Sequence, residues 1–555
     1  MDIDKTIQSA SEYYQAGDLQ RAEHICSELL KVNPDNADAL HLLGLIYYKT
    51  ENYDLAIQHI EKAVKFNPAD ADAYYNLGNA HEAKGQLDEA ITYYQKAIDL
   101  DPTFAEAHNN LGFALYSKGQ LDEAIMYHQR AIELRPNFPE AYNNLGFALH
   151  DKGKLEETIR CYQKALKLNP HYPEAYNNLG LAFQDNKQLD EALSCYRKAI
   201  EIDQDFAEAY NNIGQCLYLQ QGKVDDAMTY FDKALQIDPD CAVAHWNKSL
   251  ALLVSGNFKE GLKEFEWRWK LRKHYPYNFV QPLWDGSEIT GQTILLHSDG
   301  AFGDAIQFIR YVPLIAHRGV IVLVECQKEL KSLFQNVEGV QEVIARGEPL
   351  IHFDVHCPIM SLPLAFDTIL ETIPSNVPYI TVDPALVMKW HEKIRHDNSK
   401  LKVGLVWKGS DREERLRYRS CTLEQFSPLA RLEGITFYSL QKGEAAQQAK
   451  NPPDGMKLLD YTEEITDFSD TAALMENLDL IISVDTAAAH LAGAIGMPVW
   501  TLLPFAVDNR WLLNREDTPW YPTMRLFRQP SLGDQESVIN NVLIELQKKV
   551  KEQAR

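Results

Sequence analysis

Four segments in the second half of the chain combine residue types suited to binding and transferring a chemical group. The first, HSDGAFGDAIQF, places Gly303 and Asp304 after an apolar run and at the start of a helical pattern. A glycine-rich turn at such a junction exposes backbone N–H groups and the positive end of a helix dipole. Asp304 would add a carboxylate able to take up a proton. The structural alternative is an ordinary aspartate in a first helical turn.

The second segment, VGLVWKGSDREERLRYRSC, is an apolar run that leads into a strongly basic stretch. Its cationic residues are Lys408, Arg412, Arg415, Arg417 and Arg419. Cations beyond the carboxyl end of a strand suit an anion such as a diphosphate. Alternatively, they belong to a solvated loop and pair with its own carboxylates. The candidates that we select are Lys408 and Arg419, with the adjacent Ser420.

The third and fourth segments also place polar residues where a strand is expected to end. SLQKG carries Gln441 and Lys442 at a polar strand tip, and DLIISVDTAAAHLAG passes from an apolar run into a helix of small residues. Small side chains let phosphate oxygens approach exposed N–H groups, and a threonine hydroxyl adds a contact. The candidates of the fourth segment are Asp485, Thr486, Ala487, Ala488 and His490. A histidine in the protein core is the alternative for His490.

The elements that must position these residues are short strands alternating with helical stretches. The expected strands are TILLHS, GVIVLVE, VQEVIAR, KVGLVW, ITFYSL, DLIISV and PVWTLL. Such alternation predicts parallel sheets with crossover helices. A break near residues 383–399 predicts two Rossmann-like lobes facing across a cleft, 291–390 and 391–555. A linker rich in proline, glycine and aromatic residues is expected at 276–290.

The N-terminal half repeats itself every 34 residues. Glycines recur at 44, 78, 112, 146, 180 and 214, and prolines at 34, 68, 102, 136 and 170. Each unit contains two helical patterns that are separated by a turn and end at Asn-Pro or Asp-Pro. In these positions the sequence resembles the tetratricopeptide repeat. We expect an all-α solenoid over residues 1–275, with about eight units and irregular units at both ends.

An asparagine recurs on the first helix of most units. The positions are Asn76, Asn110, Asn144, Asn178, Asn212 and, after an insertion, Asn247. A carboxamide both donates and accepts hydrogen bonds, so a ladder of them can hold an extended peptide by its backbone. The row resembles the asparagine ladder of O-GlcNAc transferase, which implies a protein acceptor in the groove of the array. The alternative is that the amides bridge neighbouring repeats.

The net charge, the cysteines and the apolar runs of the sequence indicate which partners and which cellular compartment to expect. The net charge is −24 and the pI is about 5.2, which argues against nucleic acid or an anionic membrane surface as partner. The 8 cysteines contain no CxxC pair, as expected of reduced thiols. The sequence starts without the pattern of a signal peptide, and its apolar runs are too short to span a bilayer. We therefore expect a cytoplasmic protein, with dimerisation through the array left open.

Together, the four segments resemble the heptosyltransferase-like glycosyltransferases of the two-lobed GT-B type. The resemblance covers most of residues 290–530. It is carried by Gly303-Asp304, by Arg419-Ser420 and by residues 485–490. With the repeats in front, the chain is similar to bacterial TPR-glycosyltransferases. In that family the aspartate at the position of Asp304 is the proposed general base, and the later motif holds the donor nucleotide. Residues 276–555 contain no DxD triplet, so we expect no metal and no cofactor beyond a nucleotide-sugar co-substrate.

These expectations combine into a hypothesis for the reaction. Asp304 takes the proton of a Ser or Thr hydroxyl, and that oxygen displaces the nucleoside diphosphate from the sugar with inversion. Lys408, Arg419 and the helix start after Thr486 stabilise the leaving group. Two alternatives stay open: transfer to a glycan or lipid-linked acceptor, and a scaffold with an inactive transferase module. A later segment with Arg510 and Trp511 either closes over the donor or packs in the core.

Overall fold

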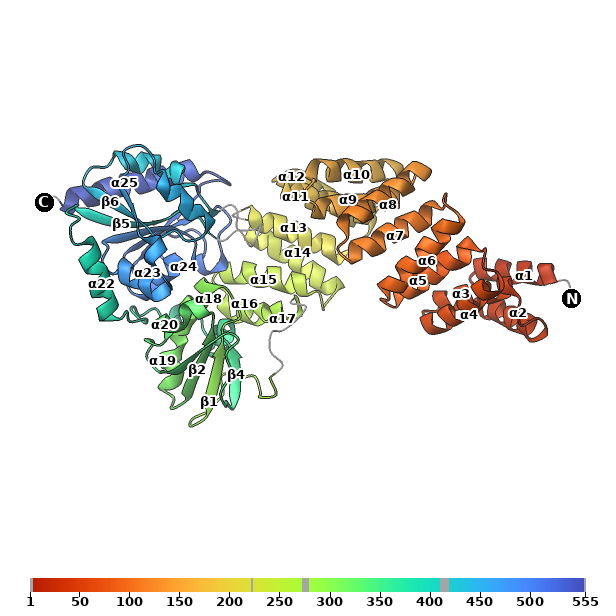
Figure 1. The fold of residues 1–555 in the computed structure, drawn as a ribbon, viewed down its shortest axis with the longest axis horizontal. Helices are drawn as coiled ribbons and strands as arrows, with labels where there is room; N and C mark the ends of the chain where they lie inside the picture. Colours follow the sequence, from red (N-terminus) through yellow and green to blue (C-terminus); the bar gives the residue numbers. More distant parts are fainter. Residues whose placement is uncertain (1–2, 221–222, 272–278, 410–418, 554–555) are drawn as a thin grey trace. The chain divides into compact units, whose positions relative to one another are not determined.

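The computed structural model describes residues 3–220, 223–271, 279–409 and 419–553. Its chain forms two compact units, Met1–Cys216 and Leu217–Arg555. The first consists of paired helices, and the second combines further helices with two parallel β-sheets (Figure 1). The array of helices extends to Leu271, but α14–α17 fall in the second unit, whereas the sequence placed all repeats in one domain, 1–275.

Helices of 13 and 14 residues alternate through the first unit and into the second. Their bounds are α1 (Ile3–Gln15), α2 (Leu19–Val32), α3 (Ala37–Lys49), α4 (Tyr53–Phe66), α5 (Ala71–Ala83), α6 (Leu87–Leu100), α7 (Ala105–Ser117), α8 (Leu121–Leu134), α9 (Pro139–Asp151), α10 (Leu155–Leu168), α11 (Pro173–Asp185), α12 (Leu189–Ile202), α13 (Ala207–Leu219), α14 (Val224–Ile237) and α15 (Ala242–Val254), followed by α16 (Phe258–Phe265) and α17 (Arg268–Leu271). The recurring glycines let paired helices approach closely: a Cβ on Gly78 would lie 2.6 Å from the Tyr94 ring. This contact explains the glycine period.

The first sheet of the second unit is wholly parallel, with the strand order β3-β2-β1-β4. Its strands are β1 (Thr293–His297), β2 (Ile321–Cys326), β3 (Val340–Ala345) and β4 (Val355–Pro358), and its helices are α18 (Phe302–Phe308), α19 (Val312–Ala316), α20 (Lys331–Phe334) and α21 (Leu362–Ala365). The chain runs from β1 outward to β3 and then returns to place β4 on the other side of β1. Parallel sheets bind ligands at such a reversal, beyond the carboxyl ends of the strands.

The second sheet has six parallel strands in the order β10-β9-β8-β5-β6-β7. The strands are β5 (Leu401–Val406), β6 (Ile435–Ser439), β7 (Leu458–Asp460), β8 (Leu480–Val484), β9 (Val499–Leu503) and β10 (Met524–Arg528), and the helices are α22 (Pro384–Ile394), α23 (Phe468–Met475), α24 (Ala487–Ala494) and α25 (Gln535–Gln553). Counted within the lobe, this is the 3-2-1-4-5-6 order of doubly wound sheets. Its reversal falls between β5 and β8. The basic segment follows β5, and Asp485 and Thr486 follow β8.

Two predicted boundaries differ from the structure. The lobe boundary at 390/391 cuts helix α22, whose Trp390 Nε1 donates a hydrogen bond to Asp470 on α23 at 3.0 Å. Helix α22 therefore packs with the second lobe, and the boundary lies before it. The predicted linker at 276–290 is not free in its described part, because Trp284 is buried and its N–H donates to the His356 carbonyl of β4 at 2.8 Å.

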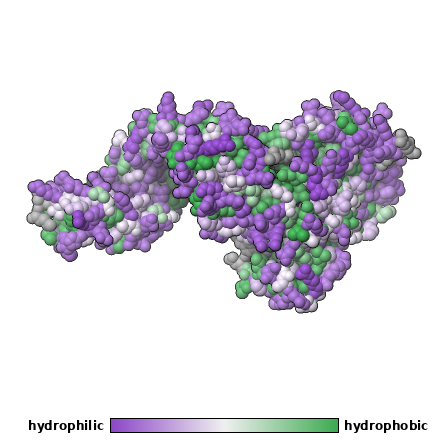
Figure 2. All heavy atoms as spheres, turned by 180° about the vertical axis from the view of Figure 1, so that it is seen from behind, coloured by the Kyte–Doolittle hydropathy of each residue, from purple (hydrophilic) through white to green (hydrophobic). Residues whose placement is uncertain are grey.

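Polar residues cover much of the surface. The face drawn in Figure 2 is mostly hydrophilic, and its hydrophobic residues lie in small groups. Among the described residues, none of the helices combines the length and apolar character needed to cross a bilayer.

Candidate functional site

The starts of α18 and α24, one from each lobe, meet at Gly303. A Cβ on this glycine would lie 2.9 Å from Cδ2 of His490 and 3.6 Å from Cα of Ala487. The first distance is too short for a side chain and the second is an ordinary van der Waals contact, so the glycine permits the close approach of the two helices. The predicted residues Gly303, Asp304, Ala487 and His490 thus come together from segments far apart in the sequence.

The Asp304 carboxylate is held by two hydrogen bonds. Its Oδ2 accepts from the backbone N–H of Ala301 at 2.8 Å, in the manner of a helix cap. Its Oδ1 accepts from Nη2 of Arg510 at 2.8 Å. The side chain retains 13% exposure. Each carboxylate oxygen has a second lone pair, so the group keeps the capacity to accept a proton from a bound hydroxyl.

Arg510, on the short 3-10 helix Asn509–Trp511, connects most of the polar groups of the site. Its Nε donates to Oδ1 of Asp508 at 2.6 Å, and its Nη1 donates to Oε1 of Gln307 at 3.1 Å. Burial alone would lower the pKa of Arg510, but the carboxylates of Asp508, Asp304 and Asp485 raise it well above its usual value. The guanidinium is therefore a permanent cation at the junction of the lobes.

His490 is a neutral member of this cluster. Its pKa is lowered well below the ordinary value by burial and then by the cations Arg510, Arg310 and Arg419. Nε2 of His490 lies 3.3 Å from Nη1 of Arg510, an obligate donor, so Nε2 accepts and Nδ1 carries the proton. Nδ1 then donates to the Tyr521 hydroxyl at 2.9 Å. This arrangement uses both ring nitrogens and leaves His490 a packing and positioning role.

The basic segment begins and ends at the carboxyl end of β5. The N–H of Gly409 donates to Oγ of Ser420 at 3.2 Å, and a Cβ on Gly409 would lie 2.9 Å from Nε of Arg419. The structure thus brings Gly409, Arg419 and Ser420 together next to Lys408. Arg412, Arg415 and Arg417 lie outside the described residues.

Across the reversal of strand order, Asp485 and Thr486 form the start of α24. Burial and then Asp508 raise the pKa of Asp485, while Arg510 and Arg419 oppose this shift, so both arginines act on the same carboxyl group. The Thr486 hydroxyl lies 3.1 Å from Oγ of Ser483, and the Thr486 carbonyl accepts from the N–H groups of residues 489 and 490. As at any helix start, the N–H groups of Ala487 and Ala488 have no partner within the helix.

Gln441 and Lys442 were predicted to contact the donor, but in the structure both side chains form hydrogen bonds with main-chain groups of the protein. Oε1 of Gln441 accepts from the N–H groups of Trp407 and Lys408 at 3.0 and 2.8 Å, which ties the ends of β5 and β6 together. Nζ of Lys442 donates to the carbonyls of Thr462 and Ile465 at 2.7 and 3.0 Å. Both side chains thus hold the segment after β6 against neighbouring parts of the chain.

The asparagines of the array bond from one repeat to the next. Nδ2 of Asn144, Asn178 and Asn212 donates to Oδ1 of Asn109, Asn143 and Asn177 at 3.2, 3.0 and 2.9 Å. Likewise, Asn110 donates to Asn79 and to the Tyr75 hydroxyl, and Asn76 bonds to His41. Asn178, Asn212 and Asn247 are buried. These bonds agree with the alternative that the amides bridge neighbouring repeats, although each carboxamide has a second N–H.

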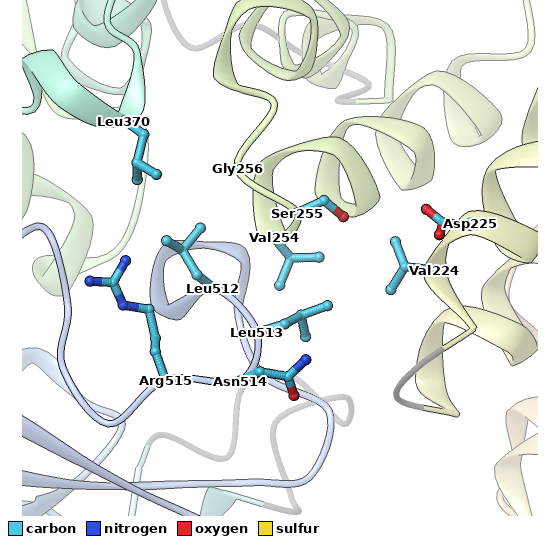
Figure 3. Close-up of a pocket in the computed structure, with 10 residues that line it drawn as sticks. All are labelled: Val224, Asp225, Val254, Ser255, Gly256, Leu370, Leu512, Leu513, Asn514 and Arg515. Atoms are coloured by element: carbon cyan, nitrogen blue, oxygen red, sulfur yellow. The ribbon is translucent and has the colours of Figure 1, made fainter.

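A cavity of about 400 Å³ lies beside the segment that follows Trp511 (Figure 3). It is lined by Val224, Asp225, Val254, Ser255, Gly256, Leu370, Leu512, Leu513, Asn514 and Arg515. Leu513 lies next to Val254 and Val224 in the close-up. Half of these residues are valine or leucine, one is the carboxylate Asp225, and the cation among them, Arg515, already pairs with Asp517 at 2.7 Å. This chemistry does not suit a diphosphate.

Sequence reasoning did not single out Gln307 and Asp508, and it left Arg510 undecided between the donor and the core. The available signal was the position of Arg510 beyond the carboxyl end of β9. Asp299 was also missed: it is buried and accepts from Nη2 of Arg268 at 3.1 Å, which anchors α17 to the end of β1. Among the described residues, no group of three or more His, Cys, Asp or Glu side chains is arranged to hold a metal ion.

Comparison with known proteins identifies the repeats. A "TPR repeat" family model matches residues 44–85, 83–119, 114–153 and 148–187, and a "Tetratricopeptide repeat" model matches 173–206 and 207–241. The N-terminal part of the chain is a TPR array. The sheets beyond it form an α/β region.

Relatives match parts of the chain. Protein FlbA of Caulobacter vibrioides is 26% identical in an alignment of 326 residues that covers 53% of this chain and 53% of FlbA, so the chain spans about half the length of this curated relative. The crystal structure of YrrB, a TPR protein with an unusual peptide-binding site, is 29% identical and covers 34% of this chain and 98% of its own, with a TM-score of 0.29. A crystal structure of MamA is 33% identical and covers 30% and 96%, with a TM-score of 0.27.

Proposed function

We propose that the chain is a protein glycosyltransferase, which moves a sugar from a nucleotide-sugar to Ser or Thr hydroxyls of a protein bound by the TPR array. One observation carries this proposal: Asp304 lies at the start of α18, against the start of α24 and beside Arg510, where the two lobes meet. A potential base and a helix start suited to an anion thus lie side by side. We expect two lobes of the GT-B type to contribute one group each in this way.

The donor diphosphate is assigned to the reversal between β5 and β8. The N–H groups of Ala487 and Ala488 offer hydrogen bonds to phosphate oxygens, and the Thr486 hydroxyl adds a third donor. Lys408 and Arg419 bring positive charge from the end of β5. These cations and the helix dipole supply the charge stabilisation that a metal ion provides in other transferases, so we propose metal-independent transfer.

The reaction is a single displacement. Asp304 accepts the proton of the acceptor hydroxyl as the hydroxyl oxygen forms its bond to the anomeric carbon. The bond from that carbon to the diphosphate oxygen breaks with its electron pair, and the nucleoside diphosphate leaves with the charge that Arg419 and the start of α24 stabilise. Attack from the face opposite the leaving group inverts the anomeric configuration.

The acceptor is assigned to the TPR array because such arrays bind polypeptides along their repeats. In the ladder, one N–H of Asn144, Asn178 or Asn212 bonds to the preceding repeat. We propose that the half-buried Asn144 offers its other N–H to a peptide carbonyl. The inter-repeat bonds would fix these amides in place before the acceptor binds, which lowers the entropy cost of binding.

A transfer assay tests the proposal. The protein is incubated with UDP-, GDP-, ADP- and CMP-sugars and a Ser/Thr-containing peptide library in EDTA, and peptides are read by mass spectrometry. We expect a mass gain of one glycosyl unit, lost about 100-fold or more in Asp304→Asn. Asp517→Asn, which alters an exposed carboxylate, is the control and should retain activity. Transfer to glycans alone, or no transfer with any donor, would refute the proposal in favour of the glycan-acceptor or scaffold alternative.

A further inference from the structure

We propose that Arg510 is a positioning residue, which orients the Asp304 carboxylate for its work as a base. The inference rests on the proposed function and deepens it. It concerns the one side chain that bonds directly to Asp304 among the described residues: Nη2 of Arg510 lies 2.8 Å from Oδ1.

The guanidinium is itself fixed from several directions. Asp508 accepts from Nε of Arg510 at 2.6 Å, and Nη1 bonds to Gln307 and His490 at 3.1 and 3.3 Å. A planar fork held in this way presents Nη2 in one direction only. Asp304 is thereby fixed in position relative to both lobes.

The backbone that carries Arg510 is also held in place. The neighbouring Trp511 ring stacks on His490, with centroids 5.2 Å apart and planes at 22°. The N–H of Arg510 donates to Oδ1 of Asp508 at 3.1 Å, and the Tyr218 hydroxyl bonds to the Val507 carbonyl at 3.5 Å. Arg510 therefore has little freedom to leave Asp304 without rearranging its own loop.

The other charged groups of the cluster do not duplicate this contact. Asp485 and Asp508 are acidic, and His490 is neutral. Among the described residues, Arg310 and Arg419 are further cations that act on His490. Arg310 bonds to the carbonyls of residues 307, 374 and 520 and to Tyr379, and Arg419 lies at the end of β5. The hydrogen bond from Arg510 is therefore the side-chain contact that orients Asp304 among the described residues.

The test is the steady-state kinetics of transfer by the full-length chain with three variants. In Arg510→Met the Asp304 carboxylate loses its fixed orientation, so kcat should fall about 10-fold or more while KM for the nucleotide-sugar stays near the wild-type value. Arg510→Lys keeps the charge without the planar fork, so kcat should fall in this variant as well. Arg515→Gln, on the same loop, should match wild type. A wild-type kcat in Arg510→Met, or a fall in kcat that Arg510→Lys fully restores, would overturn the proposal.

A second measurement does not depend on activity. In a double-mutant cycle of Asp304→Asn and Arg510→Met, followed by thermal unfolding, the summed Tm losses of the single variants should exceed the loss in the double variant. Additive losses would overturn the proposed pairing. Non-additive losses in a wild-type protein that transfers no sugar would instead refute the proposed function, and the pair would then be a tether between the lobes.

Discussion

His128 occupies the position that Tyr94, Tyr162 and Tyr196 occupy in other repeats, against the glycine of the same unit. It is fully buried, its Nδ1 bonds to Oδ1 of Asn109, and its Nε2 has no partner among the described residues. Burial lowers the pKa of His128 to about 3. The folded protein therefore holds this ring neutral, whereas the unfolded chain protonates it below a pH of about 6.5.

The sign of the stability effect follows from this difference. Because the pKa of His128 is lower in the folded state, the neutral ring contributes fully to the free energy of unfolding above pH 6.5. This contribution is lost as the pH falls toward 3. At pH 5 the penalty is about 2 kcal/mol, from about 1.4 kcal/mol per pH unit. We predict that His128→Tyr reduces the loss of Tm between pH 7 and pH 5. An identical loss in the variant and the wild type would contradict this prediction, since the other histidines titrate in both.

Asn178 distinguishes the two roles proposed for the asparagines. Its Nδ2 donates to the buried Oδ1 of Asn143, so Asn178→Ala leaves a buried acceptor without a partner and should cost about 1–3 kcal/mol of unfolding free energy. The exposed Asn186, changed to Ala, should cost less than about 0.5 kcal/mol. Denaturant unfolding measures both. If Asn178→Ala lost peptide affinity at unchanged stability, the inter-repeat bond would be shown to carry no stability.

Residue types predicted part of the candidate site and not its connections. Asp304, Arg419 and Thr486 were selected as candidates because charged or small residues beyond strand ends are informative by themselves. Gln441 and Lys442 carried the same signal, yet their partners are main-chain groups of nearby strand ends and loops. A sequence does not reveal which polar side chains satisfy the protein's own backbone.

At the scale of elements, the contact of α18 with α24 decides whether the site exists. We predict that Gly303→Ala, which sets a Cβ 2.9 Å from Cδ2 of His490, lowers the free energy of unfolding by about 1–3 kcal/mol and reduces transfer. Thermal unfolding and the transfer assay measure both effects. Wild-type stability and activity in this variant would mean that the two helices need not be in contact.

Three strands, β4, β7 and β10, were not predicted from the sequence, and one physical reason explains all three. β7 has three residues, β4 has four, and β10, MRLFR, carries two arginines among three apolar residues at an edge of its sheet. The strands that were predicted are mostly apolar runs in sheet interiors, where burial on both faces gives a continuous signal. Short and edge strands are stabilised by their neighbours, which a local pattern does not contain.

At the scale of the whole molecule, the last repeats belong with the α/β region. Asp299 at the end of β1 pairs with Arg268 of α17, and both side chains are buried. The ring of Phe258 on α16 lies 6.2 Å from that of Trp520. A boundary at 275, as the sequence suggested, would separate both pairs.

We therefore predict different behaviour for two truncated chains. A chain of residues 217–555 should unfold cooperatively, with a Tm close to that of the full-length α/β transition. A chain of 276–555 leaves the buried Asp299 carboxylate without its arginine, at a cost of about 3–5 kcal/mol, and should unfold at a lower temperature or aggregate. Differential scanning calorimetry compares them, and equal Tm values would contradict the assignment of α14–α17 to the second unit.

The central claim is that the reversal between β5 and β8 binds a nucleotide-sugar diphosphate. The most direct measurement is thermal stabilisation by UDP-, GDP-, ADP- and CMP-sugars, for the wild type and for Arg419→Ala. We predict that one nucleotide class stabilises the wild type, by about 2.7 kcal/mol at a hundredfold excess over Kd, and that Arg419→Ala loses most of this shift. No stabilisation by any of the four classes, or equal stabilisation of both proteins, would contradict the assignment.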